Sequence, residues 1–367
     1  MSMAQQSNYN NIVLETSGIE YLNMFDEGYI RNNEEFPLEG LDRLRDHGVL
    51  TANIPQDYNG WGWGESSHNA ELLELLRYVG SHDLSLGRVF EGHVNALLLI
   101  NNFGSEHQKA HYFAEALEGK LFGIWNSELP SEALKFAPHN QGYLLEGAKI
   151  FCSGANNVVR PIVTAQGEDG NQMIILHLDD YNLIEDYKFW QPFGMKASVS
   201  CRFNLEGQSF SENQLLGNSY DYVQEPDFSG GAARFAAVQL GGAHAAVKAT
   251  IAHLKKLQRT EASEQITRVA KLTVLLETGD LWLKQAGAAL DNRSNDSAFC
   301  VHYSNMFRSV IRDICEEVLK TCEMSVGLQG MMKPHDLERI HRDLTVYLKQ
   351  PGPDSAFSAI GDYILKK

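Results

Sequence analysis

Apolar residues recur at helical spacing through the first third of the chain. The runs occupy positions 41–44, 72–79 and 113–117, and glycines follow them at positions 48, 80 and 119. Spacings of three and four residues place such side chains on one face of a helix, and glycine readily takes the left-handed conformation that ends a helix. The pattern predicts that residues 15–120 are mainly helical and that each of these three helices ends at its glycine.

The pattern changes between residues 121 and 217, where short apolar runs follow one another without helical runs between them. Two of them, 161–165 and 173–178, flank Asp169-Gly170, which is a strong hairpin signal. This middle segment is predicted to form an antiparallel sheet or barrel.

Long helical patterns return from about residue 228. The candidates are 230–258, which is rich in alanine, 263–291 and 297–325. At about 1.5 Å per residue the last two would be near 40 Å long, a length that suits a four-helix bundle. The whole pattern predicts an α+β fold with an N-terminal helical domain (1–120), a middle antiparallel β-barrel or sandwich domain (121–225) and a C-terminal four-helix bundle (226–367).

Charge and composition narrow the function classes. A formal net charge of -16 argues against nucleic acid as a partner, because phosphate binding needs a basic surface. Five cysteines without paired spacing favour a reducing compartment over a disulfide framework. No apolar run is long enough for a membrane span, the first residues lack a signal-peptide pattern, and no metal-ligand motif is present. We expect a cytoplasmic protein without a metal site.

Four motifs in the middle segment occur in a recognisable order. They are Phe122–Glu128, Leu145–Ala155, Phe193–Ser198 and Glu212–Gly217. Together they resemble the flavin-binding β-domain of the acyl-CoA dehydrogenase superfamily. Flanking motifs at 104–109 and 338–343 are similar to the helical domains on either side of it, so the resemblance covers roughly residues 15 to 350.

The resemblance implies bound FAD and names residues that would hold its isoalloxazine ring. Phe151 and Ser153 stand where the family usually has a tryptophan and a threonine against the ring, and Asn126 and Ser127 stand on the strand at its pyrimidine edge. Read without the resemblance, Phe151 is equally consistent with a plain core residue and Ser153 with a turn residue.

The adenosine half of FAD would be held by a second subunit. Arg259 matches an arginine that in the family meets the pyrophosphate of a neighbour's FAD, and Gly327, Gln329 and Gly330 match the turn that receives the same group. An arginine and backbone N–H groups both suit phosphate. The resemblance therefore implies a homodimer or homotetramer assembled through the C-terminal bundle.

The catalytic glutamate of the dehydrogenases is missing. Its usual position is Pro351, and its known alternative position is Ala233, beside Arg234. Asp354 is three residues past the first position and could act as a displaced base, although it also fits an N-cap of a last helix. On this interpretation the protein is an FAD-dependent oxidoreductase that acts on the CH–CH bond of an acyl thioester, with Arg234 and Asp354 at the catalytic site and an electron-transfer flavoprotein as a candidate partner.

Two alternatives use the same fold. Flavin monooxygenases that resemble these dehydrogenases also lack the glutamate, receive reduced flavin from a flavin reductase, and depend on a histidine and a hydroxyl at the flavin. His93 and Ser153 stand at the matching places, although His93 could equally be a hydrogen-bonded, solvent-facing helix residue. The remaining alternative is a family member that binds acyl ligands without turnover.

Overall fold

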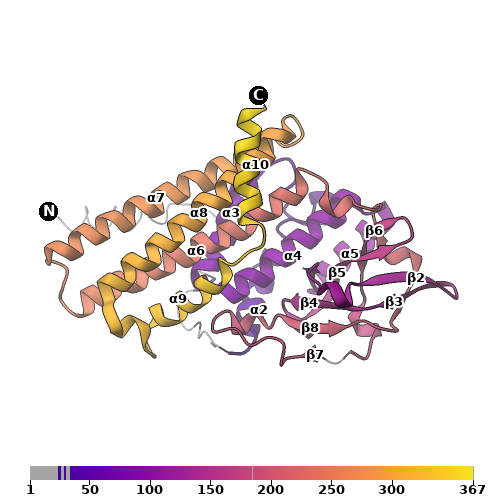
Figure 1. Ribbon diagram of the computed structural model, residues 1–367, viewed down its shortest axis with the longest axis horizontal. Helices are drawn as coiled ribbons and strands as arrows, with labels where there is room; N and C mark the ends of the chain where they lie inside the picture. Colours follow the sequence, from indigo (N-terminus) through magenta and orange to yellow (C-terminus); the bar gives the residue numbers. More distant parts are fainter. Residues whose placement is uncertain (1–23, 26–28, 30–33, 184, 367) are drawn as a thin grey trace.

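The computed structural model describes the chain except residues 1–23, 26–28, 30–33, 184 and 367. The N-terminal segment expected to lack a signal peptide, and the start of the expected first domain, lie outside the described residues. A bundle of long helices occupies one side of the molecule and a curled β-domain the other, with the N-terminal helices packed behind both (Figure 1). The expected order of helical domain, sheet and helical bundle is confirmed.

The N-terminal region contains four described α-helices: α2 (Leu38–Asp46), α3 (Asn69–His82), α4 (Leu84–Phe103) and α5 (Glu106–Leu117). As predicted, α2 and α5 end just before Gly48 and Gly119, which both have positive φ. The prediction for Gly80 is wrong, because α3 continues to His82. A Cβ atom on Gly80 would lie 2.3 Å from the carbonyl oxygen of Val238, so this glycine allows close helix packing rather than ending a helix.

The β-domain holds a larger sheet of seven strands and a smaller one of three. The larger sheet contains β1 (Leu121–Trp125), β2 (Lys135–His139), β3 (Gly142–Glu146), β5 (Val158–Gly167), β6 (Gly170–Ile175), β9 (Ser209–Phe210) and β10 (Leu215–Leu216). The smaller sheet contains β4 (Ala148–Cys152), β7 (Glu185–Asp186) and β8 (Cys201–Asn204).

The hairpin at Asp169-Gly170 is confirmed, since β5 and β6 pair out to Gly167 and Gly170. The larger sheet is mixed rather than wholly antiparallel, because β1 and β2 both pair in parallel with β5. Three strands separate β1 from β5 in the chain, which gives the connection enough length for parallel pairing.

The C-terminal region consists of α6 (Asp227–Lys256), α7 (Ser263–Asp291), α8 (Ser297–Val326), α9 (Asp336–Tyr347) and α10 (Pro353–Leu365). Helix α6 lies between α3, α8 and α9. Its small residues allow this: a Cβ atom on Gly241 would lie 2.1 Å from the carbonyl oxygen of Arg77 in α3. Helix α3 thus packs against two of the three long C-terminal helices, α6 and α7.

One hydrophobic core joins the three regions. A single cluster of buried side chains includes Leu76 of α3, Phe203 of β8 and Leu240 of α6. All five cysteines are buried and free, in agreement with their interpretation as small apolar groups. Among the described helices, none combines the length and the apolar character that crossing a membrane requires.

Candidate active site

Phe151 is an exposed aromatic residue in a constrained backbone. It sits where β4 bulges against β8, with φ at 54°, and its side chain is 48% exposed. A left-handed conformation is unusual for an aromatic residue, and bulges often re-aim a side chain next to a site. The Phe151 ring lies 5.2 Å from that of Phe189 and 6.2 Å from that of Trp190. These rings form an accessible aromatic wall.

Ser153 begins a directed chain of hydroxyl groups. Its Oγ lies 2.9 Å from Ser200 Oγ, which in turn lies 2.9 Å from Ser198 Oγ. Ser198 must donate its only hydroxyl proton to the carbonyl oxygen of Met195, 2.8 Å away, because a carbonyl can only accept. Ser200 therefore donates to Ser198, and Ser153 donates to Ser200. The Ser153 oxygen is left as an acceptor on its open side.

Asn126 and Ser127 follow β1 and lie beside β4. The backbone N–H of Ile150 donates to the Ser127 carbonyl at 2.9 Å, and the Thr164 hydroxyl donates to the Asn126 side chain. Both residues are exposed. The structure therefore brings Asn126 and Ser127 to the same edge of the β-domain as Phe151.

An ion pair between a buried lysine and a partly exposed glutamate supports this edge. Lys149 is fully buried, and its Nζ lies 2.5 Å from Glu128 Oε2 and 3.2 Å from the Asn126 carbonyl oxygen. Burial lowers the pKa of Lys149, against the opposing effect of Glu128. Glu128 also accepts from the backbone N–H of Leu134. Glu128 and Lys149 thus fix the geometry of the strands beneath Phe151.

His93 lies inside the core rather than facing a ligand or solvent. It is fully buried; its Nε2 lies 2.8 Å from the Leu50 carbonyl oxygen, and its Nδ1 accepts from the backbone N–H of Phe122 at 3.0 Å. Burial lowers the pKa of His93 to about 4, so the ring is neutral at pH 7. With both ring nitrogens engaged by backbone, His93 ties the 49–51 turn to β1, and this geometry argues against the expected catalytic role.

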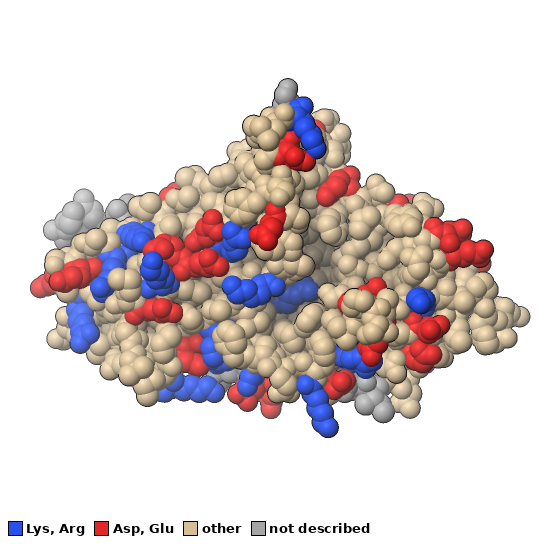
Figure 2. All heavy atoms as spheres, in the orientation of Figure 1, with Lys and Arg blue, Asp and Glu red and all other residues tan. Residues whose placement is uncertain are grey.

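Asp354 is exposed in the first turn of α10, a helix that packs against α8. It is not an N-cap either, because α10 begins at Pro353 and its N-cap position is Gly352. In Figure 1 this helix projects from the body of the molecule. Figure 2 shows the surface hollowed below α10, where the bundle and the β-domain meet. The structure gives Asp354 no contact that supports its expected role as a base.

Arg259, Gly327 and Gln329 are exposed, and Gly330 is buried. All four lie at one end of the bundle, where the first turn of α7 meets the end of α8 through a hydrogen bond from Gln265 to the Ser325 carbonyl. This end points away from the β-domain (Figure 1). These residues are therefore remote from the Phe151 wall of their own chain.

Arg234 belongs to a polar network that the sequence reading missed. Its Nε donates to the side-chain oxygen of Asn95, and Asn95 donates to Glu91. Glu91 Oε2 lies 2.5 Å from Arg88 Nη1. The available signal was the spacing of Arg88, Glu91 and Asn95, three and then four residues, which places these polar side chains on one face of a helix. Ala233, the alternative base position, is fully buried in the core.

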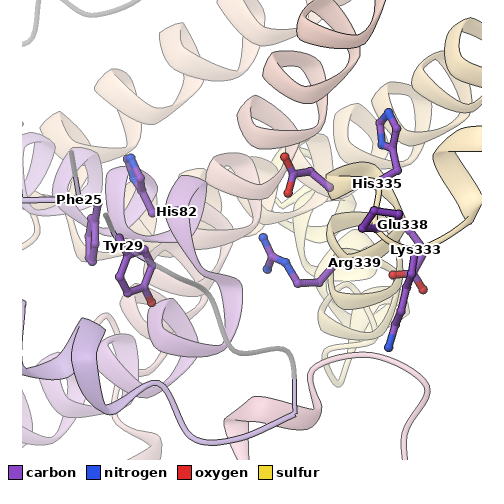
Figure 3. Close-up of a pocket in the computed structure, with 9 residues that line it drawn as sticks. Phe25, Tyr29, His82, Lys333, His335, Glu338 and Arg339 are labelled. Atoms are coloured by element: carbon purple, nitrogen blue, oxygen red, sulfur yellow. The ribbon is translucent and has the colours of Figure 1, made fainter. Parts of the chain in front are cut away.

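A separate cavity of about 450 Å³ lies between the end of α3 and the start of α9. Phe25, Tyr29 and His82 line one side, and residues 333–336, 338 and 339 line the other (Figure 3). Arg339 in this wall pairs with Asp343 at 3.5 Å, and Asp343 accepts from the backbone N–H of Met195 at 2.6 Å. This pair joins the bundle to the β-domain. None of the predicted flavin residues lines the cavity.

The described part of the chain holds no cluster of three or more histidine, cysteine, aspartate or glutamate side chains that could bind a metal.

The architecture closely matches a solved structure, that of the dibenzothiophene monooxygenase TdsC from Paenibacillus in complex with FMN and indole. The TM-score is 0.82 and the identity 18%, over 91% of both chains. This likeness shows the shared fold.

The chain belongs to the acyl-CoA dehydrogenase family. The models for the N-terminal and the C-terminal domain of acyl-CoA dehydrogenase match residues 22–120 and 220–354. A dibenzothiophene monooxygenase of Rhodococcus erythropolis is 32% identical over 120 residues, which are 30% of this chain and only 27% of that protein. A probable acyl-CoA dehydrogenase of Bacillus subtilis is 23% identical over 343 residues, 86% of both proteins.

Proposed function

We propose that this protein is a flavin-dependent monooxygenase that uses reduced flavin and dioxygen to oxygenate a small organic molecule. One observation carries the proposal: the edge that would hold a flavin is intact, while both family positions for the proton-abstracting glutamate lack a carboxylate. They hold Ala233 and Pro351. Asp354 lies on the surface helix α10, and each oxygen of Glu91 is already engaged, by Arg88 or by Asn95.

The residues present fit an isoalloxazine ring. The exposed face of Phe151 offers an apolar wall, and the Ser153 hydroxyl and the exposed Asn126 and Ser127 offer polar groups at its edge. A reduced flavin, when bound, supplies the two electrons with which one atom of dioxygen enters the substrate and the other leaves as water. The protein's own residues hold the ring and fix the hydrogen bonds at its edge.

The direction of the serine chain favours the reduced cofactor. Reduced flavin carries a proton on N5, whereas N5 of oxidised flavin is an acceptor. Because the Ser153 proton is committed to Ser200, Ser153 can accept from a protonated N5 but has no proton to give an unprotonated one. This arrangement therefore favours the binding of reduced flavin over that of oxidised flavin.

The relatives support the proposal unequally. The Rhodococcus monooxygenase has a higher sequence identity to this chain than the Bacillus relative, but over a shorter segment. The Paenibacillus enzyme shares the fold. The Bacillus relative, matched over 86% of its length, favours acyl-thioester dehydrogenation as a second candidate function. That function was the first expectation from sequence, and it requires a base. Since the described structure places no free carboxylate at either family position, oxygenation is the better supported reaction.

Oxygen uptake tests the proposal. The protein is supplied with reduced FMN or FAD by a flavin reductase, with and without a panel of small organic molecules, and both oxygen consumption and oxygenated product are measured. We expect at least one compound to yield an oxygenated product in proportion to the oxygen consumed. Oxygen consumption that yields only hydrogen peroxide with every compound, together with turnover of an acyl-CoA, would overturn the proposal.

We also propose that the chain assembles through its bundle. Helix α7 exposes Ile266, Val274 and Leu281, which are 56%, 64% and 58% exposed and share one face at near-heptad spacing. Such a stripe is typical of a contact surface. A second subunit packed on the bundle is also what Arg259 and Gln329 need to reach another chain's flavin. Light scattering of the full chain should give a dimer or tetramer; a monomer at micromolar concentration would contradict this.

A further inference from the structure

Helix α4 carries three polar side chains on one face. Arg88, Glu91 and Asn95 occupy positions three and four residues apart, so they share a face. Glu91 is only 3% exposed, and Arg234 of α6, which meets this face, is 7% exposed. Burying charged groups is costly unless each is neutralised. Each charge in this network therefore needs a partner of opposite sign.

Arg234 has no ion-pair partner among the described residues. The single carboxylate, Glu91, pairs with Arg88, and its other oxygen accepts from Asn95. Arg234 donates to Asn95, a neutral amide, and no described carboxylate lies within ion-pair distance of it. The nearby Arg293 and Asp227 pair with each other and add no net charge. Burial lowers the pKa of Arg234 to about 10, as expected for a guanidinium that lacks a full counter-charge.

A second unmet polar group lies beside this network. The Tyr347 side chain is 2% exposed, and its hydroxyl has no hydrogen-bond partner in the described structure. Glu91 and Arg88 are the charges that act on this phenol. A buried hydroxyl without a partner is rare in native proteins. An unused donor and an unmatched cation thus belong to one cluster.

The cluster lies next to the proposed flavin edge. A Cβ atom on Gly92 in α4 would lie 4.0 Å from Gly123 Cα in β1, the strand that leads into Asn126. A Cβ atom on Gly154, which directly follows Ser153, would lie 3.7 Å from Val89 in α4. Helix α4 therefore contacts the flavin-facing strands at Val89 and Gly92 and contacts Arg234 through Asn95.

We propose that this cluster binds the anionic head of a small organic substrate, a carboxylate, sulfinate or sulfonate. Arg234 supplies the unmatched positive charge and Tyr347 the unused donor, while Glu91 and Asn95 hold Arg234 in place. The inference rests on the proposed function, because it names the class of molecule that would be oxygenated. A neutral acyl chain or a neutral aromatic ring would leave both groups unsatisfied.

Equilibrium binding to the full-length protein, without flavin or turnover, tests the proposal. The melting temperature is followed against acetate and methanesulfinate as anionic probes and against acetamide and dimethyl sulfoxide as their neutral counterparts, at constant ionic strength. We expect a saturating rise with the two anions and none with the neutral compounds. Equal responses to charged and neutral probes would overturn the proposal.

Three variants locate the binding. Arg234→Gln should weaken the affinity for both anions at least tenfold, whereas Arg268→Gln, which removes a partly exposed arginine of α7, should leave it unchanged. Tyr347→Phe removes an unpartnered hydroxyl, so it should not lower the melting temperature, yet it should weaken anion binding about fivefold. If Arg234→Gln does not fold, Tyr347→Phe decides. Anion affinity that is unaltered in Tyr347→Phe, or in folded Arg234→Gln, would overturn the assignment.

Failure of this inference and failure of the proposed function give different results. Anion binding that depends on Arg234, without oxygenated product, would retain the binding site and reject the monooxygenase. Oxygenation of neutral compounds alone, without anion binding, would retain the monooxygenase and reject the anion site.

Discussion

Ser153 donates its hydroxyl proton to Ser200, 2.9 Å away, because the proton of Ser198 is committed to the Met195 carbonyl. The direction of this chain is fixed by a backbone carbonyl some distance from the open edge. It makes Ser153 an acceptor toward any group placed against β4. The chemistry of the site is thus set partly by residues of the 195–200 loop.

Ser200→Ala should reduce the preference for reduced over oxidised flavin. Without Ser200, the Ser153 proton is free to donate to oxidised N5, so the ratio of the two affinities should fall by roughly fivefold, the value of about 1 kcal/mol for one hydrogen bond. The midpoint potential of the bound flavin measures this ratio. Ser309→Ala, which removes a buried hydroxyl in α8, is the control. Equal potentials in wild type and Ser200→Ala would refute the relay.

His93 should make stability depend on pH. Burial lowers the pKa of His93 to about 4 from its ordinary 6.5, so the unfolded chain takes up a proton that the folded chain excludes. The stabilisation of the folded state by the neutral His93 ring is complete above pH 6.5. It is lost as the pH falls toward 4, by up to about 1.4 kcal/mol per pH unit. Urea unfolding at several pH values gives the free energy of unfolding as a function of pH. This free energy should change less steeply with pH in His93→Gln than in wild type. Parallel slopes would mean that His93 titrates normally.

The Lys149–Glu128 ion pair, whose lysine is fully buried, should contribute more to stability than a pair in which both side chains are exposed. Glu128→Gln leaves the fully buried Lys149 charge unmatched, so it should lower the free energy of unfolding by about 2–4 kcal/mol. Adding Lys149→Met should recover part of that loss. Glu317→Gln, which breaks the exposed pair with Lys271, should cost at most about 0.5 kcal/mol. Similar losses for Glu128→Gln and Glu317→Gln would contradict this role.

Arg259 should distinguish FAD from FMN. If it meets the pyrophosphate of a partner's FAD, Arg259→Ala should weaken FAD binding by roughly tenfold or more, since a hydrogen bond to a charged group contributes about 1.5–3 kcal/mol. FMN lacks the adenosine phosphate, so its affinity should not change. Titration of flavin fluorescence measures both, with the exposed Lys256→Ala as control. An equal loss for FAD and FMN would show that Arg259 acts on structure rather than on the cofactor.

Much of the fold followed from local patterns. The three long helices were predicted within a few residues of their observed bounds, because long runs without breakers leave few alternatives. Gly80 misled the prediction because its role is tertiary: it admits the backbone of α6 into contact with α3. The parallel pairing of β1 with β5 also depends on partners distant in sequence.

The site was less accessible to sequence reasoning. The positions of Phe151 and Ser153 came from the family resemblance, but Ser200 is 47 residues from Ser153 and only the folded loop brings them together. His93 was expected at the flavin, and its burial became visible only when β1 was placed over it. Arg88, Glu91 and Asn95 were overlooked because single polar residues in a helix usually face solvent.

Anaerobic mixing with acyl-CoA tests the central claim most directly. The protein is loaded with oxidised flavin, oxygen is removed, and the visible absorption of the flavin is followed after addition of short-, medium- and long-chain acyl-CoA. With Ala233 and Pro351 at the two base positions, we predict no bleaching on the timescale of turnover, in wild type and in Asp354→Asn alike. Rapid bleaching of the wild type by any of these thioesters would contradict the account and restore the dehydrogenase, with Asp354 as its base if Asp354→Asn abolishes the reaction.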